Sequence, residues 1–187
     1  MRWPVALLAG YLLLALQPPV CEALRLGSTS AYPSLILPFV VFIALFASPT
    51  AALWTGLFAG LAIDLSTPRG DAALIIAGPH ALAYLAAAAF VLRTRPLVMR
   101  RNPLTLAVLS ILAGTIAALI INLLFAVRRV LWGDHFADPL LGDLWQRLIG
   151  AAYTGGAALI LWAILTPLAR FFAFQEQGAR RPFVKQH

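Results

Sequence analysis

The chain has 187 residues, of which 61% are apolar and only 11% charged, and its mean hydropathy is +0.87. Soluble domains carry roughly 25% charged residues, so this composition indicates a membrane protein. At one helix per ~20 apolar residues, a chain of this length holds about five or six spanning helices and excludes a large extramembrane catalytic domain. We therefore expect an all-α polytopic membrane protein in which residues 1–187 form a single transmembrane domain.

The basic excess, a net charge of +7 with a pI near 10.8, is explained by membrane topology rather than by nucleic acid. Basic residues collect in the cytoplasmic loops of membrane proteins, and no basic stretch here is interleaved with base-stacking aromatic residues. We expect no nucleic-acid partner. The single cysteine, Cys21, excludes an internal disulfide and a cysteine-based metal cluster.

The first apolar segment begins after Arg2 and reaches two prolines, Pro18 and Pro19, which predicts a first spanning helix over about 3–20. An apolar core behind one basic residue, followed by Ala23, is also typical of a cleaved signal peptide. The residues before Ala23 match the small-residue cleavage pattern poorly. The retained helix is therefore the preferred interpretation, and cleavage is the alternative.

The next apolar stretch, residues 31–65, is too long for one span. A proline after a serine at its middle, Ser48-Pro49, predicts a turn between two helices over about 32–47 and 50–65. Each helix would rise only about 22 to 24 Å, which is short for a ~30 Å hydrocarbon core. A single long kinked span with a re-entrant piece is the alternative.

Three further spans are predicted in the second half of the chain, at about 72–92, 104–127 and 148–172. Pro79 lies inside the first of these, where it is expected to free the carbonyl of Ile75 and to kink the helix. The last two spans are separated by the longest predicted loop, residues 128–147, which holds three aspartates and three arginines.

An even number of spans places both termini on one side of the membrane, and the basic residues identify that side. The side of the termini holds nine: Arg2, Arg93, Arg95, Arg100, Arg101, Arg170, Arg180, Arg181 and Lys185. The other side holds five: Arg25, Arg69, Arg128, Arg129 and Arg147. The first side is therefore expected to be the cytoplasm, and Cys21 is expected to lie on the opposite side.

Asp64 is an acidic residue at the end of an apolar helix, and it is the main candidate for a functional or partner-holding group. An ionisable side chain at membrane depth is costly and is therefore a functional candidate by default. The structural alternative places Asp64 at the interface, where it accepts hydrogen bonds from the amides of the following turn or pairs with Arg69. Because the helix dipole disfavours a negative charge near a helix C-terminus, Asp64 should have a compensating partner.

His80 and Asn122 are two possible polar contacts inside predicted spans. His80 could serve as a proton relay or ligand. However, no second histidine, cysteine or carboxylate lies at helical spacing from it, so a satisfied position in the core is preferred. Asn122 is expected to form a hydrogen bond to a neighbouring helix rather than to bind a substrate.

Pairs of small residues four positions apart predict places where helix backbones approach closely. These pairs are Gly56 with Gly60, Gly114 with Ala118, Ala151 with Gly155, and Ala152 with Gly156. The sequence holds no nucleotide-binding glycine loop, no metal-ligand spacing and no Ser/His/Asp set in one region. We therefore expect no enzymatic activity, no metal and no cofactor, and an intramembrane enzyme is the least supported alternative.

The run LWTGLFAGLAIDLSTPRG, residues 53–70, resembles the rod shape-determining protein MreD family. The pattern of that family is a glycine-containing helix, an aspartate, a short turn with Pro-x-Gly, and another helix. The matching positions here are Gly56, Gly60, Asp64, Pro68 and Gly70. The chain departs from the family in two places: the turn at 48–49 lacks the basic residues often found there, and the loop at 128–147 is long and acidic.

The resemblance implies a six-helix fold similar to the substrate-binding membrane subunits of energy-coupling-factor vitamin transporters. It also implies a non-enzymatic scaffold of the bacterial cell-elongation complex, which maintains rod shape during peptidoglycan synthesis, in the inner membrane with both termini cytoplasmic. The implied partners are an MreC-like bitopic membrane protein, a peptidoglycan synthase and transpeptidase pair, cytoskeletal MreB indirectly, and membrane lipids.

The alternative function is the substrate-binding membrane subunit of a vitamin or solute transporter, which the implied fold keeps open. Such a subunit needs a pocket with several inward polar groups. The sequence offers few of them: His80, Tyr84 and Asn122.

Overall fold

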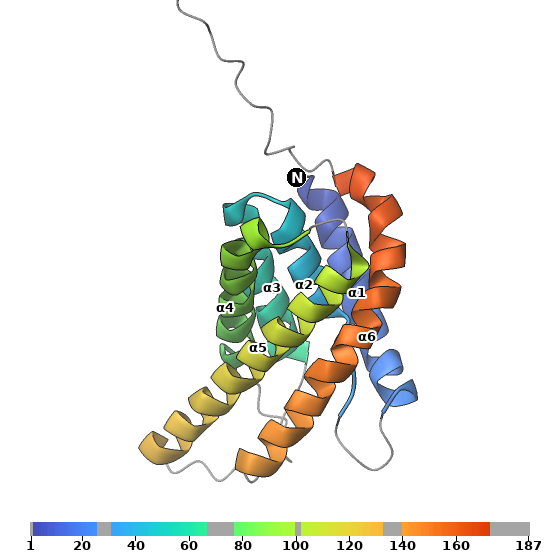
Figure 1. Cartoon of the computed structure of the whole chain (residues 1–187). Coiled ribbons are helices and arrows are strands. Elements are labelled where there is room, and N and C mark those ends of the chain that lie inside the picture. Colours follow the sequence, from blue (N-terminus) through green and yellow to red (C-terminus); the bar gives the residue numbers. More distant parts are fainter. Residues whose placement is uncertain (1, 26–30, 67–76, 100–101, 133–139, 173–187) are drawn as a thin grey trace, which may run out of the picture.

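The computed structural model describes residues 2–25, 31–66, 77–99, 102–132 and 140–172. This part of the chain is all-helical, which confirms the predicted all-α class (Figure 1). Its elements are α1 (Trp3–Ala23), α2 (Ile36–Phe46), α3 (Pro49–Ser66), α4 (Pro79–Thr94), η1 (Arg95–Leu97), α5 (Pro103–Trp132) and α6 (Leu140–Phe172).

Three of the described helices are long and apolar enough to cross a membrane, which is consistent with a membrane protein. They are α1 over Trp3–Ala23, α5 over Pro103–Leu131 and α6 over Leu144–Ala169. The apolar helix α2 is shorter, because its 11 residues rise only about 16 Å at 1.5 Å per residue. The described residues form six α-helices in the predicted order, and three of these are both long and apolar enough for a full span.

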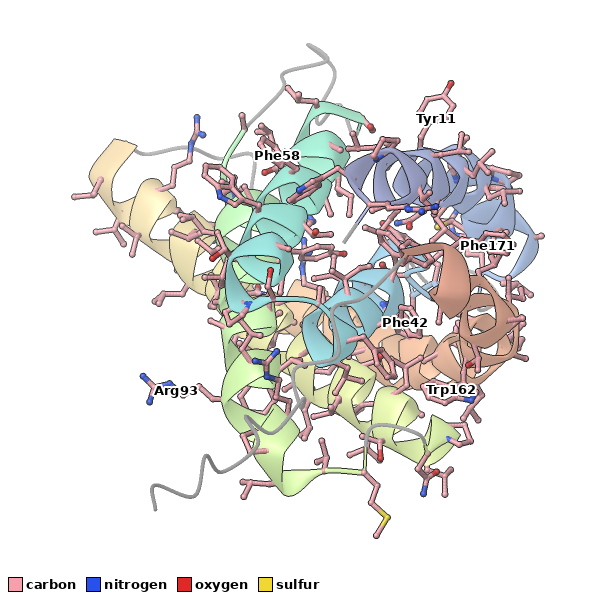
Figure 2. All side chains as sticks on the ribbon, turned by 90° about the horizontal axis from the view of Figure 1, so that it is seen from above. Tyr11, Phe42, Phe58, Arg93, Trp162 and Phe171 are labelled. Carbon is pink, nitrogen blue, oxygen red and sulfur yellow. The ribbon has the colours of Figure 1, made fainter. Side chains whose placement is uncertain are left out.

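Helix α2 forms the centre of the bundle. Its sequence, ILPFVVFIALF, is apolar on every side, and a helix of this kind is stable only where it is surrounded. Ten of its residues, from Ile36 to Leu45, are buried, and it contacts every other α-helix. The buried ring of Phe42 packs against the partly buried Trp162 of α6, with ring centroids 6.3 Å apart (Figure 2).

The chain turns between α2 and α3 at Ala47 and Ser48. Ala47 has an extended backbone, and Pro49 begins α3, where its missing N–H needs no partner. The structure therefore has two separate helices in the stretch where the sequence predicted a turn at Ser48-Pro49. The guanidinium of Arg95 donates a hydrogen bond of 3.0 Å to the carbonyl oxygen of Ala47 and so caps the end of α2.

The fourth helix begins at Pro79, and the expectation that Pro79 lies inside a longer helix is wrong. Residues 77 and 78 are not helical, and Gly78 has a φ of +125°, which L side chains rarely adopt. Pro79 is therefore the first residue of α4 and produces no kink. The carbonyl of Ile75, which the kink was expected to free, lies outside the described residues.

Three other helices are longer than predicted. Helix α1 continues through Pro18 and Pro19 to Ala23. Helix α5 continues to Trp132, and α6 already begins at Leu140, so the expected loop over 128–147 is wrong at 128–132 and 140–147; residues 133–139 lie outside the described residues. The added parts of α5 and α6 are rich in leucine and arginine, which have high helix propensity. The charged residues there were interpreted as a loop, but they are compatible with a helix.

Candidate functional site

Asp64 lies in the last turn of α3, and its carboxylate caps the start of α4. It accepts hydrogen bonds from the backbone N–H of Gly78 at 2.8 Å, of His80 at 3.1 Å and of Ala81 at 3.3 Å. The first N–H groups of a helix have no partner within that helix, and the helix N-terminus carries a partial positive charge. A buried carboxylate therefore finds there both the donors and the charge that it requires.

The imidazole of His80 is the second partner of Asp64. Its Nδ1 lies 2.7 Å from Asp64 Oδ1, and only 4% of the surface of Asp64 is exposed. The compensating partner expected for Asp64 is therefore α4 itself together with His80, whereas Arg69 lies outside the described residues. Helical spacing could not reveal this pair, because the two residues belong to different helices.

Two glycines of α3 allow the close approach that this capping requires. A Cβ atom at Gly60 would collide with the carbonyl oxygen of His80, and one at Gly56 would lie 2.7 Å from that of Tyr84. Both obstacles are backbone atoms, which a rotamer change cannot move. Gly56, Gly60 and Asp64 thus act on the same neighbour, α4, along one face of α3; Pro68 and Gly70 lie outside the described residues.

Of the other small-residue pairs, some face a neighbouring helix and one faces away from the bundle. Gly114 of α5 faces Ala151 of α6, with 2.9 Å between the Cβ of Ala151 and a Cβ placed on the glycine. Gly155 of α6 faces the side chain of Ile111 of α5. In contrast, a Cβ at Gly156 would meet no atom within 4 Å. The close contact between α5 and α6 therefore uses the pair Ala151 and Gly155 and not the pair at 152 and 156.

A polar cavity of about 300 Å³ lies beside His80, and all six described α-helices and the segment that leads into α2 contribute to its lining. Its polar lining residues are Gln17, Tyr32, Ser34, His80, Tyr84, Gln146, Arg147 and Thr154. Small and apolar residues form the rest of its wall, among them Gly114, Ala118, Gly150, Leu37 and Ile121.

Hydrogen bonds hold the walls of this cavity in place. The N–H of Ser34 donates to Thr154 Oγ1 at 2.9 Å, and the hydroxyls of Ser34 and Tyr84 are 3.3 Å apart. The side-chain carbonyl of Gln17 accepts from the N–H groups of Leu35 and Ile36, both at 3.3 Å. The network thus joins α1, α4 and α6 to the start of α2.

Sequence reasoning identified His80 and Tyr84 but not the polar residues that face them. Gln17, Gln146 and Arg147 lie near helix ends, where polar residues are ordinary, so nothing in the sequence alone distinguishes them. Asn122 does not line the cavity. Its Nδ2 donates to the carbonyl of Ala118 at 3.0 Å within α5, instead of forming the expected bond to a neighbouring helix.

A second cavity, of about 530 Å³, is almost entirely apolar and lies where α1 meets α2 and α3. Trp3, Leu7 and Tyr11 contribute to it from α1, and Phe39 and Phe58 from the other side. Within the described residues, no group of three or more histidine, cysteine, aspartate or glutamate side chains could hold a metal ion.

Comparisons of the chain with protein-family models, with curated proteins and with solved structures found no match.

Proposed function

We propose that the chain is a non-enzymatic scaffold of the bacterial cell-elongation complex. One observation carries this proposal: Gly56, Gly60 and Asp64, which carry the resemblance to the MreD family, serve a single contact with α4. Pairs of glycines arise often by chance in a chain rich in small residues. Here each of the three matched residues has a physical role in the contact between α3 and α4. This supports the resemblance better than the spacing of the residues in the sequence does.

In this role the tightly packed pair of α3 and α4 is a rigid part on which partners assemble. Helices associate in a bilayer through close packing and a few polar contacts, because the lipid supplies no hydrophobic driving force. The outer face of α3 offers a stacked aromatic pair, Trp54 and Phe58, with ring centroids 5.3 Å apart and both side chains exposed. The adjacent α1 buries only Ala6. These apolar faces suit helix packing against an MreC-like bitopic protein.

The proposal includes a six-span arrangement in the inner membrane with both termini cytoplasmic. Its support is the nine-to-five division of basic residues between the two sides. The further proposed partners are a peptidoglycan synthase and transpeptidase pair, MreB indirectly, and membrane lipids.

Depletion of the protein in medium rich in vitamins tests the proposal. Elongated cells should become swollen and round, and the purified protein should enrich a bitopic membrane protein rather than a vitamin. Asp64→Ala should reduce that enrichment while the protein still inserts, and Ser66→Ala is the matched control on the same helix. Normal cell shape together with a growth defect that one vitamin cures would overturn the scaffold proposal.

The polar cavity favours a second candidate function, the substrate-binding membrane subunit of a transporter. It brings together more inward polar groups than the sequence indicated, among them Gln17, Gln146 and Arg147. Ligand pockets combine apolar walls with a small number of placed polar groups, as this cavity does. Recovery of a vitamin with the purified protein, and not of a membrane partner, would support this candidate.

A further inference from the structure

The polar cavity is lined by several hydrogen-bond donors. Arg147 supplies a permanent positive charge, Gln17 and Gln146 supply amides, and none of the lining residues that the structure describes is acidic. We propose that this cavity is a binding site for an anionic group, a phosphate or a carboxylate, on a small molecule or on a lipid. The proposal goes beyond the scaffold role and does not depend on it.

Arg147 and two amide side chains supply the donors for such a group. A guanidinium has five N–H donors in a plane, so it can hold two oxygens of a phosphate or carboxylate while it keeps other contacts. The carbonyl of Gln17 already accepts the N–H groups of Leu35 and Ile36, which leaves its NH₂ as the part that can donate to a ligand. Gln146 adds a second amide to the same wall.

The pairing of His80 with Asp64 places a further nitrogen at the cavity. Asp64 holds Nδ1, so Nε2 is the ring nitrogen that remains, and it donates to an anion when the ring carries a proton on both nitrogens. The ring also packs edge-on against Tyr84, with centroids 6.3 Å apart, and its orientation is therefore set from two sides. The carboxylate of Asp64 lies behind the ring of His80 and is not part of the lining, so the N–H groups of α4 and the ring of His80 meet its oxygens, and a ligand does not.

Small residues form one wall of the cavity. Gly114, Ala118, Gly150 and Ala151 line it on α5 and α6. The cavity of about 300 Å³ is at the lower end of the range for small-molecule sites, ~300 to 1,000 Å³. It suits the anionic part of a ligand, such as a glycerol phosphate group, but not the acyl chains of a lipid.

The test uses the full chain and has one arm for each source of the anion. In the first arm, the protein in detergent is titrated with sn-glycerol 3-phosphate, and with glycerol at matched ionic strength, while its thermal unfolding is followed. In the second arm, nanodiscs containing equal amounts of phosphatidylglycerol and phosphatidylcholine are analysed by native mass spectrometry for the lipid retained on the protein. We expect anion-specific binding in at least one arm, and the arm that responds identifies the source.

Three variants separate the cavity from the basic surface. Arg147→Gln should weaken binding roughly tenfold to a hundredfold, because a charge-assisted contact is lost. Arg129→Gln removes an identical charge from exposed α5 surface that does not line the cavity, and should leave binding unchanged. Ala118→Leu keeps every charge but fills part of the volume, and should also abolish binding.

The proposal is overturned if neither probe binds the wild-type protein better than its uncharged or zwitterionic counterpart. It is equally overturned if Arg129→Gln weakens binding as much as Arg147→Gln does, or if Ala118→Leu binds like the wild type. If Arg147→Gln fails to fold, the comparison between Ala118→Leu and Arg129→Gln gives the decision.

Discussion

Asp64 shows how one residue can make a buried charge tolerable. A carboxylate removed from water is costly unless charged or hydrogen-bonding groups replace its hydration. Here three backbone N–H groups and the ring of His80 surround the two oxygens. The same contacts satisfy N–H groups that α4 cannot pair by itself. The buried carboxylate of Asp64 therefore needs the first N–H groups of α4, and these N–H groups need the carboxylate.

This dependence predicts the effect of removing the carboxylate. Asp64→Ala should lower the free energy of unfolding by about 1 to 3 kcal/mol, because several buried donors lose their acceptor. Asp64→Asn keeps one acceptor oxygen and should cost less. Thermal unfolding in detergent measures both changes. Ser66→Ala, which removes an exposed hydroxyl bonded only to Ala62 of its own helix, is the control and should have almost no effect. If Asp64→Ala and Ser66→Ala were equally stable, the capping role of Asp64 would be contradicted.

A second prediction compares two arginines near the end of α4. The guanidinium of Arg95 bonds to the carbonyl of Ala47, at a helix C-terminus where a positive charge is favourable. Arg93 is exposed and points away from the bundle (Figure 2). Arg95→Ala should therefore lower the unfolding free energy by about 1 kcal/mol more than Arg93→Ala, since only the first loses a capping bond. The two variants carry the same charge change, so an equal effect in chemical denaturation would contradict this role.

At the level of single residues, the sequence was informative about which side chains are unusual but not about their partners. It identified Asp64 and His80 separately, because each is a polar residue in an apolar context. Their pairing depends on how α3 packs on α4, and no spacing along one helix encodes that. Gly78-Pro79, in contrast, is a local signal for a helix start, since glycine supplies the positive φ and proline suits the first helical position, but it was interpreted as a kink inside a longer helix.

At the level of elements, the contact between α3 and α4 predicts a contrast between two glycines. Gly60→Ala should destabilise the protein by about 1 to 3 kcal/mol, because the added methyl group meets the backbone of α4 and forces the helices apart. Gly156→Ala points into open space, so the higher helix propensity of alanine should leave stability equal or raise it by up to about 1 kcal/mol. Unfolding temperatures of the two variants measure this contrast. Similar values for both would show that α3 and α4 are not held by close packing.

The order of the helices followed from the apolar runs, whereas several of their ends did not. Ser48-Pro49 correctly indicated the turn after α2, because a proline restricts the residue before it. The ends of α1, α5 and α6 were misplaced because prolines and charged residues were interpreted as stops. Near the ends of a bundle, such residues can continue a helix wherever packing or water satisfies them.

At the level of the whole molecule, the polar groups gather at one end of the bundle. Gln17 lies late in α1, His80 begins α4, and Gln146 and Arg147 lie early in α6. Because consecutive helices run in opposite directions, these positions come together at the same end (Figure 1). The sequence contains this alternation, but whether such residues face inward depends on the rotation of each helix. The cavity therefore became visible only in the packed structure.

The proposed topology predicts which end of the bundle faces the cytoplasm. Leu24, just after α1, and Met99, after η1, lie at opposite ends of the bundle and are exposed (Figure 1). Three basic residues, Arg2, Arg93 and Arg95, lie at the same end of the bundle as Met99. Because basic residues collect on the cytoplasmic side, this end is expected to face the cytoplasm. Cys21 is only partly exposed, so the probes should be Leu24→Cys and Met99→Cys, each combined with Cys21→Ser.

In spheroplasts, a membrane-impermeant thiol reagent should label Leu24→Cys at once and Met99→Cys only after lysis. The reason is physical, because a charged reagent cannot cross the hydrocarbon core and reaches only the end that faces outward. The Cys21→Ser chain without an added cysteine is the blank. The reverse pattern would show that the nine-to-five basic division does not set the orientation, and labelling of both positions before lysis would contradict the membrane-spanning arrangement itself.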